Sequence, residues 1–174
     1  QSVSSSFLRS INSMGIATGD YDEDQDFDYY ITNINSNILL RNDSGVYSDQ
    51  AENAGVTSQW TVIDTTGLQE YELIESWSWG TMFFDYDNDT YIDLFVSNGV
   101  YQSLLAEDEP DSVDENRLYR NLDAAGIFED VSVITGMNDG GTFRGCAKSD
   151  FDRDGDLDIV LVQLDSLGGS KRTV

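Results

Sequence analysis

Three nine-residue acidic segments, each followed by an apolar run, constrain the fold of this chain more than any other feature. They begin at Asp20, Asp85 and Asp150, which are 65 residues apart, and each has aspartates at its first, third, fifth and ninth positions. Aspartates this close repel one another unless a cation lies among them, and a set of oxygen ligands favours a hard cation such as calcium. The spacing therefore predicts up to three calcium loops, one in each copy of a repeated structural unit.

In each loop we expect the four aspartate side chains to bind the ion together with the backbone carbonyl of the seventh residue, which is Asp26, Tyr91 or Asp156. The predicted ligand residues are Asp20, Asp22, Asp24, Asp26, Asp28, Asp85, Asp87, Asp89, Tyr91, Asp93, Asp150, Asp152, Asp154, Asp156 and Asp158.

These loops differ from an EF-hand, which requires a bidentate glutamate at position 12 and flanking helices. Position 12 is apolar in all three loops (Ile31, Val96 and Leu161). Position 6 favours glycine, because it needs a left-handed backbone. Only the third loop has that glycine, Gly155, so the sequence predicts that the third site is the best formed of the three.

The loops are embedded in a pattern of short strands. A glycine stands five residues before each loop, and β-rich runs follow at 29–32, 94–97 and 159–162. In the first two units, two further runs around a turn glycine predict a hairpin. Each unit is thus expected to be four short antiparallel strands, the make-up of a β-propeller blade.

The predicted organisation is a single all-β segment with about two and a half blades. In an up-and-down blade, the two insertions would emerge on the face opposite the metal loops. Residues after the second strand of the third unit are expected to form a loop or tail. The boundaries are 1–174 for the segment, 14–55 and 79–136 for the full blades, 144–174 for the partial blade, 56–78 and 101–115 for the insertions, and 166–174 for the tail.

Composition excludes several function classes. With 33 acidic and 9 basic residues, the chain has a net charge of −24, so nucleic acid and anionic membranes are unfavourable partners. The absence of histidine and the presence of one cysteine exclude Ser-His-Asp and Cys-His catalysis and the usual zinc sites. The sequence contains no run of 18 apolar residues, so it predicts no membrane-spanning helix. We expect a protein that is not an enzyme.

The combined pattern resembles the FG-GAP/VCBS propeller repeats, in particular those found with ASPIC/UnbV domains and in cartilage acidic protein. The segments that carry the resemblance are 80–89 with 92–98, 116–121 with 126–131, and 157–162 with the third loop. The resemblance implies calcium between the first two strands of each blade and an extracellular, cell-surface or periplasmic location. It also implies kinship with the integrin α-subunit head.

Function is expected on the face opposite the calcium loops, where a protein or glycan ligand would bind in an adhesion, interaction or structural role. One alternative is a carbohydrate-binding or polysaccharide-lyase propeller. Another is a subunit of a fibre or multi-chain assembly, with further blades supplied by the same polypeptide or by neighbouring subunits. Candidate ligand-binding residues are Trp60, Tyr71, Trp77, Tyr101, Glu107, Asp108 and Glu109, and Asn42 is a candidate glycosylation site.

Overall fold

Short antiparallel strands make up most of the chain in this computed structural model. The structure describes residues 11–58, 60–62, 72–74, 76–99, 114–123, 125–164 and 170–173. Its elements are β1 (Ile16–Gly19), β2 (Asp28–Ile31), β3 (Ile38–Asp43), β4 (Val46–Asp49), α1 (Ala51–Ala54), β5 (Trp60–Val62), β6 (Glu72–Ile74), β7 (Ser78–Phe84), β8 (Asp93–Asn98), β9 (Arg117–Asn121), β10 (Phe128–Asp130), α2 (Ser132–Thr135), β11 (Phe143–Ser149), β12 (Asp158–Leu164) and β13 (Ser170–Thr173).

The first two sheets are four-stranded meanders. Strands β1 to β4 form one sheet in chain order, and β7 to β10 form the second. The turn before β4 uses Gly45 and the turn before β10 uses Gly126, both at positive φ, a conformation that glycine adopts without strain. The predicted all-β class and its four-stranded antiparallel units are confirmed.

The third sheet corrects one prediction. Residues 166–174 were expected to form a loop or tail, but Ser170–Thr173 forms β13, which pairs antiparallel with β12. The third unit therefore has three strands, in the order β11-β12-β13. The tail lacks a long apolar run, and its pairing comes from β12, whose free edge offers backbone hydrogen bonds.

Two one-turn helices, α1 and α2, follow the fourth strands and were not predicted. Each ends at a glycine in the left-handed conformation, Gly55 and Gly136, whose N–H bonds back to the helix carbonyls. The sequence predicted only that the first two units end at these glycines. A single turn is too short to leave a helical periodicity in the sequence.

The hydrophobic core lies between successive sheets, in two separate clusters. The first junction, between sheets one and two, consists of Ala17, Tyr21, Tyr30, Leu39, Ala51, Ala54, Val56, Phe83, Leu94, Val96, Tyr119 and Phe128, with Ile92 packed against them. The second junction, between sheets two and three, consists of Met82, Phe84, Phe95, Leu118 and Val131, with Tyr86, Met137, Cys146, Ile159 and Leu161 packed against them.

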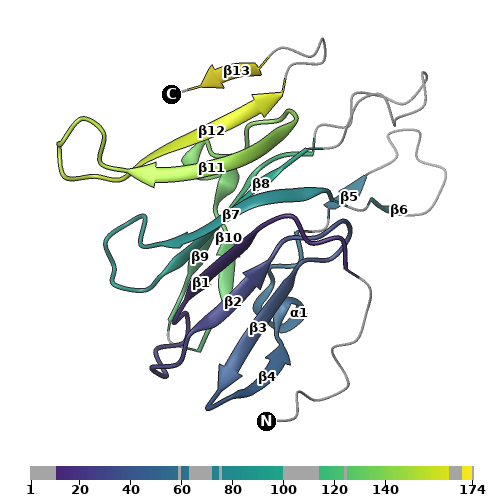
Figure 1. The fold of residues 1–174 in the computed structure, drawn as a ribbon, viewed down its shortest axis with the longest axis vertical. Helices are drawn as coiled ribbons and strands as arrows, with labels where there is room; N and C mark the ends of the chain where they lie inside the picture. Colours follow the sequence, from purple (N-terminus) through teal and green to yellow (C-terminus); the bar gives the residue numbers. More distant parts are fainter. Residues whose placement is uncertain are drawn as a thin grey trace.

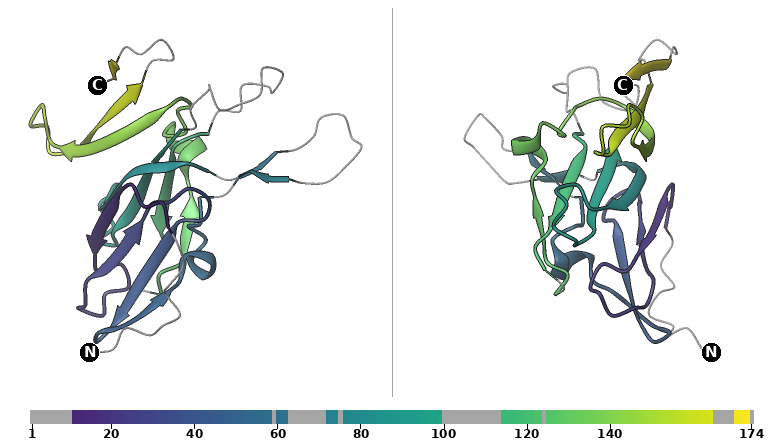
Figure 2. Two further views of the ribbon diagram at one scale, coloured as in Figure 1. Left: turned by 45° about the vertical axis from the view of Figure 1, so that its right-hand side comes forward. Right: turned by 90° about the vertical axis from the view of Figure 1, so that its left-hand side faces the viewer.

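The sheets are stacked in chain order, with β1 beside β7 and β7 beside β11 (Figure 1). The turned views of Figure 2 show the first sheet at one end of the stack and the third at the other. Strand β8 is buried along its whole length, whereas β12 is only partly covered. The apolar runs at 29–32, 94–97 and 159–162 would be expected to lie between neighbouring sheets, and this holds for β8 but not for β12 or for the outer face of β2. In the described part of the chain the stack is open, with no closed ring.

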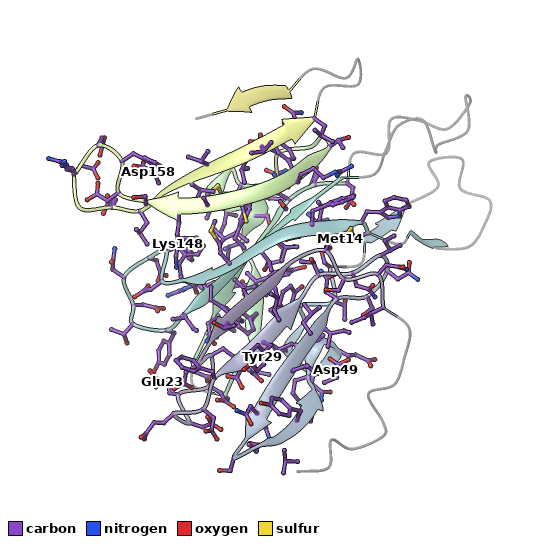
Figure 3. The ribbon with its side chains drawn as sticks, viewed as in Figure 1. Met14, Glu23, Tyr29, Asp49, Lys148 and Asp158 are labelled. Atoms are coloured by element: carbon purple, nitrogen blue, oxygen red, sulfur yellow. The ribbon has the colours of Figure 1, made fainter. Side chains whose placement is uncertain are left out.

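The connections between first and second strands lie along one side of the stack, at the left in Figure 1, and the β5–β6 hairpin from the first insertion lies on the other side. Figure 3 shows the same polarity, with Glu23 and Asp158 on the loop side and Met14 on the opposite side. No helix among the described residues is long and apolar enough to cross a membrane.

Candidate metal centres

Each acidic segment connects the first two strands of its sheet. We call residues 20–28 loop 1, residues 85–93 loop 2 and residues 150–158 loop 3. The ninth residue of each loop begins the second strand and pairs with the last residue of the first strand: Gly19 with Asp28, Phe84 with Asp93, and Ser149 with Asp158. The three loops therefore start and end at equivalent points of the ladder.

The carboxylate at position 1 organises the backbone of its own loop. Asp20 accepts hydrogen bonds from the N–H groups of Asp24 and Gln25, both at 3.0 Å. Asp85 and Asp150 accept the two corresponding bonds in loops 2 and 3. The first carboxylate therefore holds the backbone of the fifth and sixth residues in the same way in all three loops.

The carboxylate at position 9 joins the loop to the sheet. In loop 1, Asp28 accepts hydrogen bonds from the N–H of Tyr21 at 3.1 Å and from that of Asn42 in β3 at 2.8 Å. Asp93 accepts the equivalent pair in loop 2, and both side chains are fully buried. Asp158 is exposed and accepts a bond from Phe151 at 2.8 Å.

Positions 1, 3 and 9 converge in every loop. Their carboxylate oxygens lie within 4.8 Å of one another in three separate groups: Asp20, Asp22 and Asp28; Asp85, Asp87 and Asp93; Asp150, Asp152 and Asp158. Nine of the predicted ligands are thus brought together in three sets of three.

Position 5 lies outside these groups. One oxygen of Asp24 accepts the N–H of Asp26 at 2.9 Å, and Asp89 and Asp154 make the same bond to the seventh residues of their loops. The fifth carboxylate thus has one oxygen engaged by the backbone and one left for other partners. The carbonyl ligands expected at Asp26, Tyr91 and Asp156 stay predictions.

The loop backbone is left-handed at positions 4 and 6. At position 6, φ is 74° for Gln25, 83° for Thr90 and 102° for Gly155. Position 4 also has positive φ in all three loops (Glu23, Asn88 and Arg153). The backbone requirement expected at position 6 is therefore present, and only loop 3 meets it with glycine.

Burial makes the first two groups costly in the absence of a cation. It raises the pKa of Asp28 and of Asp93 to about 6, although backbone donors act in the opposite direction. Burial, followed by the nearby charge of Asp24, also raises the pKa of Asp22. A cation among these oxygens would remove the desolvation and repulsion that disfavour the charged forms.

One oxygen in loop 1 points specifically to a missing partner. Asp22 Oδ1 is buried and accepts no hydrogen bond from any described residue. A buried unpaired carboxylate oxygen is unfavourable. Together with the all-oxygen donor set, it fits calcium better than a metal that prefers nitrogen or sulfur.

Two arginines beside the loops were not anticipated as site residues. In loop 2, Arg120 lies 2.8 Å from Asp87 and 2.9 Å from Asp89. In loop 1, Arg41 lies 3.9 Å from Asp22 and pairs more closely with Asp43, at 2.8 Å. The sequence does hold a signal for them, because each arginine directly precedes an asparagine in the third strand.

Those asparagines support the loops as well. The Nδ2 atom of Asn42 donates to the carbonyl of Phe27 at 3.2 Å, and that of Asn121 donates to Ile92 at 3.2 Å and to Tyr21 at 2.8 Å. The nitrogen of Asn42 that would carry a glycan is thus engaged in the same loop-supporting contact as its counterpart.

The candidate ligand face is described only in part. Trp77 is half-buried and forms an isolated bridge with Ile34, and its N–H donates to the buried Asp114 at 2.9 Å. Trp60 lies in β5, with its side chain outside the described structure. The remaining candidates, Tyr71, Tyr101, Glu107, Asp108 and Glu109, lie outside the described residues.

No family model matches the sequence, and no curated protein matches it significantly.

Proposed function

We propose that this chain is a calcium-binding, calcium-stabilised segment of an extracellular β-propeller, with an adhesion, interaction or structural role. The observation that carries the proposal is the convergence of three equivalent carboxylate groups, each within 4.8 Å, in three loops with the same backbone hydrogen bonds. One acidic cluster is common on a protein surface, but three in the same register are not accounted for by solvated turns.

The residues that would hold the ion are those at loop positions 1, 3 and 9, with positions 5 and 7 completing the shell. Calcium takes six to eight oxygen ligands, so water would fill the remaining places. The ion would neutralise the clustered aspartates and fix the turn between the first two strands. Its contribution is to folding, because metal binding to the native state alone adds to the free energy of unfolding.

The stack of sheets supports the propeller part of the proposal. Blade-like units in chain order, packed face to face with their first strands side by side, match the arrangement of propeller blades around an axis. Because the acidic loops lie on one side of the stack, the other side, with the β5–β6 hairpin, is left for a protein or glycan ligand. An extracellular location agrees with this role, since extracellular calcium modules work at high calcium concentrations.

Calcium titration with loop variants tests the proposal. Position 3 is the best place for substitution in loop 1, because Asp20 and Asp28 each accept two backbone hydrogen bonds, whereas Asp22 Oδ1 is buried without a partner among the described residues. Isothermal titration calorimetry should detect calcium binding that weakens at one site in each of Asp22→Asn, Asp87→Asn and Asp152→Asn. Asp139→Asn removes an exposed carboxylate outside the loops and should leave binding unchanged.

Thermal melting completes the test. A chelator should lower the melting temperature of the calcium-loaded protein clearly, and magnesium at the same concentration should restore it less well. If calcium releases no measurable heat and the melting temperature is the same with and without chelator, the proposed role of the loops is wrong.

A further inference from the structure

The two junctions are built alike, so each sheet has two distinct faces. We call the face toward the following sheet the trailing face, and the face toward the preceding sheet the leading face. On the trailing face of sheet one, Ala17, Tyr21 and Tyr30 are at most 6% exposed because sheet two covers them. On the leading face of sheet three, Cys146, Ile159 and Leu161 pack on sheet two.

No described element covers the trailing face of sheet three. It consists of Gly145, Ala147, Ser149, Phe151, Val160 and Val162. Phe151 occupies the loop position of Tyr21 and is 58% exposed, and Val162 is 44% exposed. Val162 stands where Thr32 and Ser97 donate hydroxyl hydrogen bonds to the next sheet, so at this position the open face is apolar where the internal trailing faces are polar.

The leading face of sheet one has no cover from the described residues either. It includes Ile16, Phe27, Tyr29 and Ile31. Phe27 occupies the loop position of Ile92, which packs in the first junction, yet Phe27 is 69% exposed. Ile16 occupies the position of Cys146 and is 60% exposed. Large apolar residues are therefore exposed at the positions that the junctions bury.

The open trailing face of sheet three keeps the glycine that both junctions use. Directly before β1, Gly15 leaves room for the backbone of β7, since a Cβ there would lie 2.2 Å from the carbonyl oxygen of Trp79. Gly80 leaves similar room for Arg144 of β11, where the distance would be 2.8 Å. At Gly145 the nearest atom would be 3.9 Å away, on Val162 of its own sheet. The third sheet has the same room for a neighbouring strand, and no described strand fills it.

We propose that two copies of this chain associate head to tail, with the leading face of sheet one in one copy packing on the trailing face of sheet three in the other. A second copy of the chain is the partner that fits, because the two open faces are the two halves of a contact that the chain already makes twice. Such a contact is heterologous and either closes into a ring or continues as a filament.

Charge sets the conditions under which this contact forms. The net charge of −24 makes two copies repel each other. Association should therefore strengthen with added salt and with calcium. The contact itself does not require calcium in the loops, so its failure would leave the proposed metal sites standing, and the reverse also holds.

Single-face variants test the proposal by analytical ultracentrifugation of the whole chain over a concentration series. Ile16→Lys blocks the leading face and Val162→Lys blocks the trailing face. Val133→Lys makes the same kind of change at a residue of α2 that is 72% exposed and lies on neither face. Melting curves of dilute samples check that each variant folds, and Ile16→Thr with Val162→Thr is a milder pair for the same faces.

A head-to-tail contact gives a distinctive result. The average mass of the unmodified chain and of Val133→Lys should rise with concentration, while each single-face variant stays monomeric alone. An equimolar mixture of the two single-face variants should form a dimer that grows no further, because each supplies the face that the other has lost. A monomeric unmodified chain, loss of association in only one variant, or a mixture that stays monomeric would each overturn the proposal.

Discussion

Arg120 competes directly for the carboxylates that would bind a cation in loop 2. Its guanidinium group lies within 2.9 Å of both Asp87 and Asp89, whereas Arg41 lies 3.9 Å from Asp22 in loop 1. A positive charge so close opposes the entry of calcium. Because a positive charge beside the carboxylates repels the incoming cation, Arg120→Gln should raise the calcium affinity of loop 2 by roughly fivefold.

Titration calorimetry of the variant checks this prediction. Arg117→Gln is the matched control, because Arg117 lies on the same strand but pairs with Glu115 and Asp130. Arg117→Gln should leave the calcium affinity of loop 2 unchanged. Arg41→Gln should raise the affinity of loop 1 by less than Arg120→Gln raises that of loop 2. A lower affinity in Arg120→Gln would instead mean that the arginine holds the loop in its binding conformation.

The buried carboxyl of Asp114, on the side of the stack away from the acidic loops, makes the stability of the protein depend on pH. It is 2% exposed and accepts hydrogen bonds from the Ser76 hydroxyl at 2.8 Å and the Trp77 N–H at 2.9 Å. Burial raises the pKa of this carboxyl from 3.8 to about 6, against the effect of those donors and of Arg117. The folded state therefore binds this proton more tightly than the unfolded state does.

The direction of this pH dependence follows from the linkage between proton binding and folding. Because the folded-state pKa is raised, the contribution of Asp114 to stability falls as the pH rises from about 4 to about 6. A shift of this size corresponds to roughly 3 kcal/mol across that window. In Asp114→Asn, the difference in unfolding free energy from the unmodified protein should change with pH by up to that amount. Urea titrations with saturating calcium measure it, and a constant difference would contradict the prediction.

At the scale of the loop, backbone conformation separates loop 3 from the others. A non-glycine residue in the left-handed region costs about 1–2 kcal/mol, and Thr90 is β-branched at a φ of 83°. Thr90→Gly should therefore stabilise the protein, although the greater entropy of glycine in the unfolded state reduces the gain to about 0.5–1 kcal/mol. Denaturant unfolding with and without calcium measures the effect.

The reverse change in loop 3 is the control for that prediction. Gly155 has a φ of 102° and no atom within 4 Å of an added Cβ, so Gly155→Thr introduces backbone strain without a clash. It should destabilise by about 1–2 kcal/mol. Equal effects of the two changes in the same direction would show that φ at position 6 does not decide loop stability.

The loops and strands were predictable because their signals are local. Aspartate spacing and apolar runs located the acidic loops, and the turn glycines Gly45 and Gly126 located the hairpins. Strand β13 was missed because its pairing depends on the free edge of β12 and not on its own sequence. Helices α1 and α2 were missed because a single helical turn is too short to show a periodic pattern of apolar residues.

Site quality was harder to predict than site position. Glycine at position 6 favoured loop 3, but burial favours loops 1 and 2, where Asp28 and Asp93 are fully buried and Asp158 is exposed. That difference depends on Asn42 and Asn121, whose backbone N–H groups reach the ninth carboxylate from the third strand. Contacts between separate strands leave only an indirect trace in the sequence, here the repeated Arg-Asn pair.

At the scale of the whole molecule, the sheets are held together as much by close backbone approach as by side-chain packing. The hydroxyls of Thr32 and Ser97 donate across the junctions to the carbonyls of Trp79 and Arg144, at 2.7 and 3.1 Å. These carbonyls come within reach because a glycine stands opposite each of them. The regular placement of Gly15 and Gly80 thus sets the spacing of the sheets in the stack.

Glycine substitutions test this spacing. In Gly80→Ala, the new Cβ would meet the Arg144 carbonyl at 2.8 Å and Cys146 Sγ at 2.9 Å. The Arg144 carbonyl cannot move without shifting β11, so the variant should lose about 1–3 kcal/mol of stability, as overpacked sites do. Gly145→Ala meets nothing closer than 3.9 Å and should stay within about 0.5 kcal/mol of the unmodified protein in dilute solution.

The same pair of variants separates folding from assembly. If the trailing face of sheet three receives a second copy, Gly145→Ala places its Cβ where the incoming strand must approach, and head-to-tail association should weaken while the melting temperature of the dilute protein stays the same. Gly80→Ala should do the reverse, lowering the melting temperature and leaving the open faces intact. Equal stability losses in the two variants would mean that the junction between sheets two and three does not depend on the room that Gly80 provides.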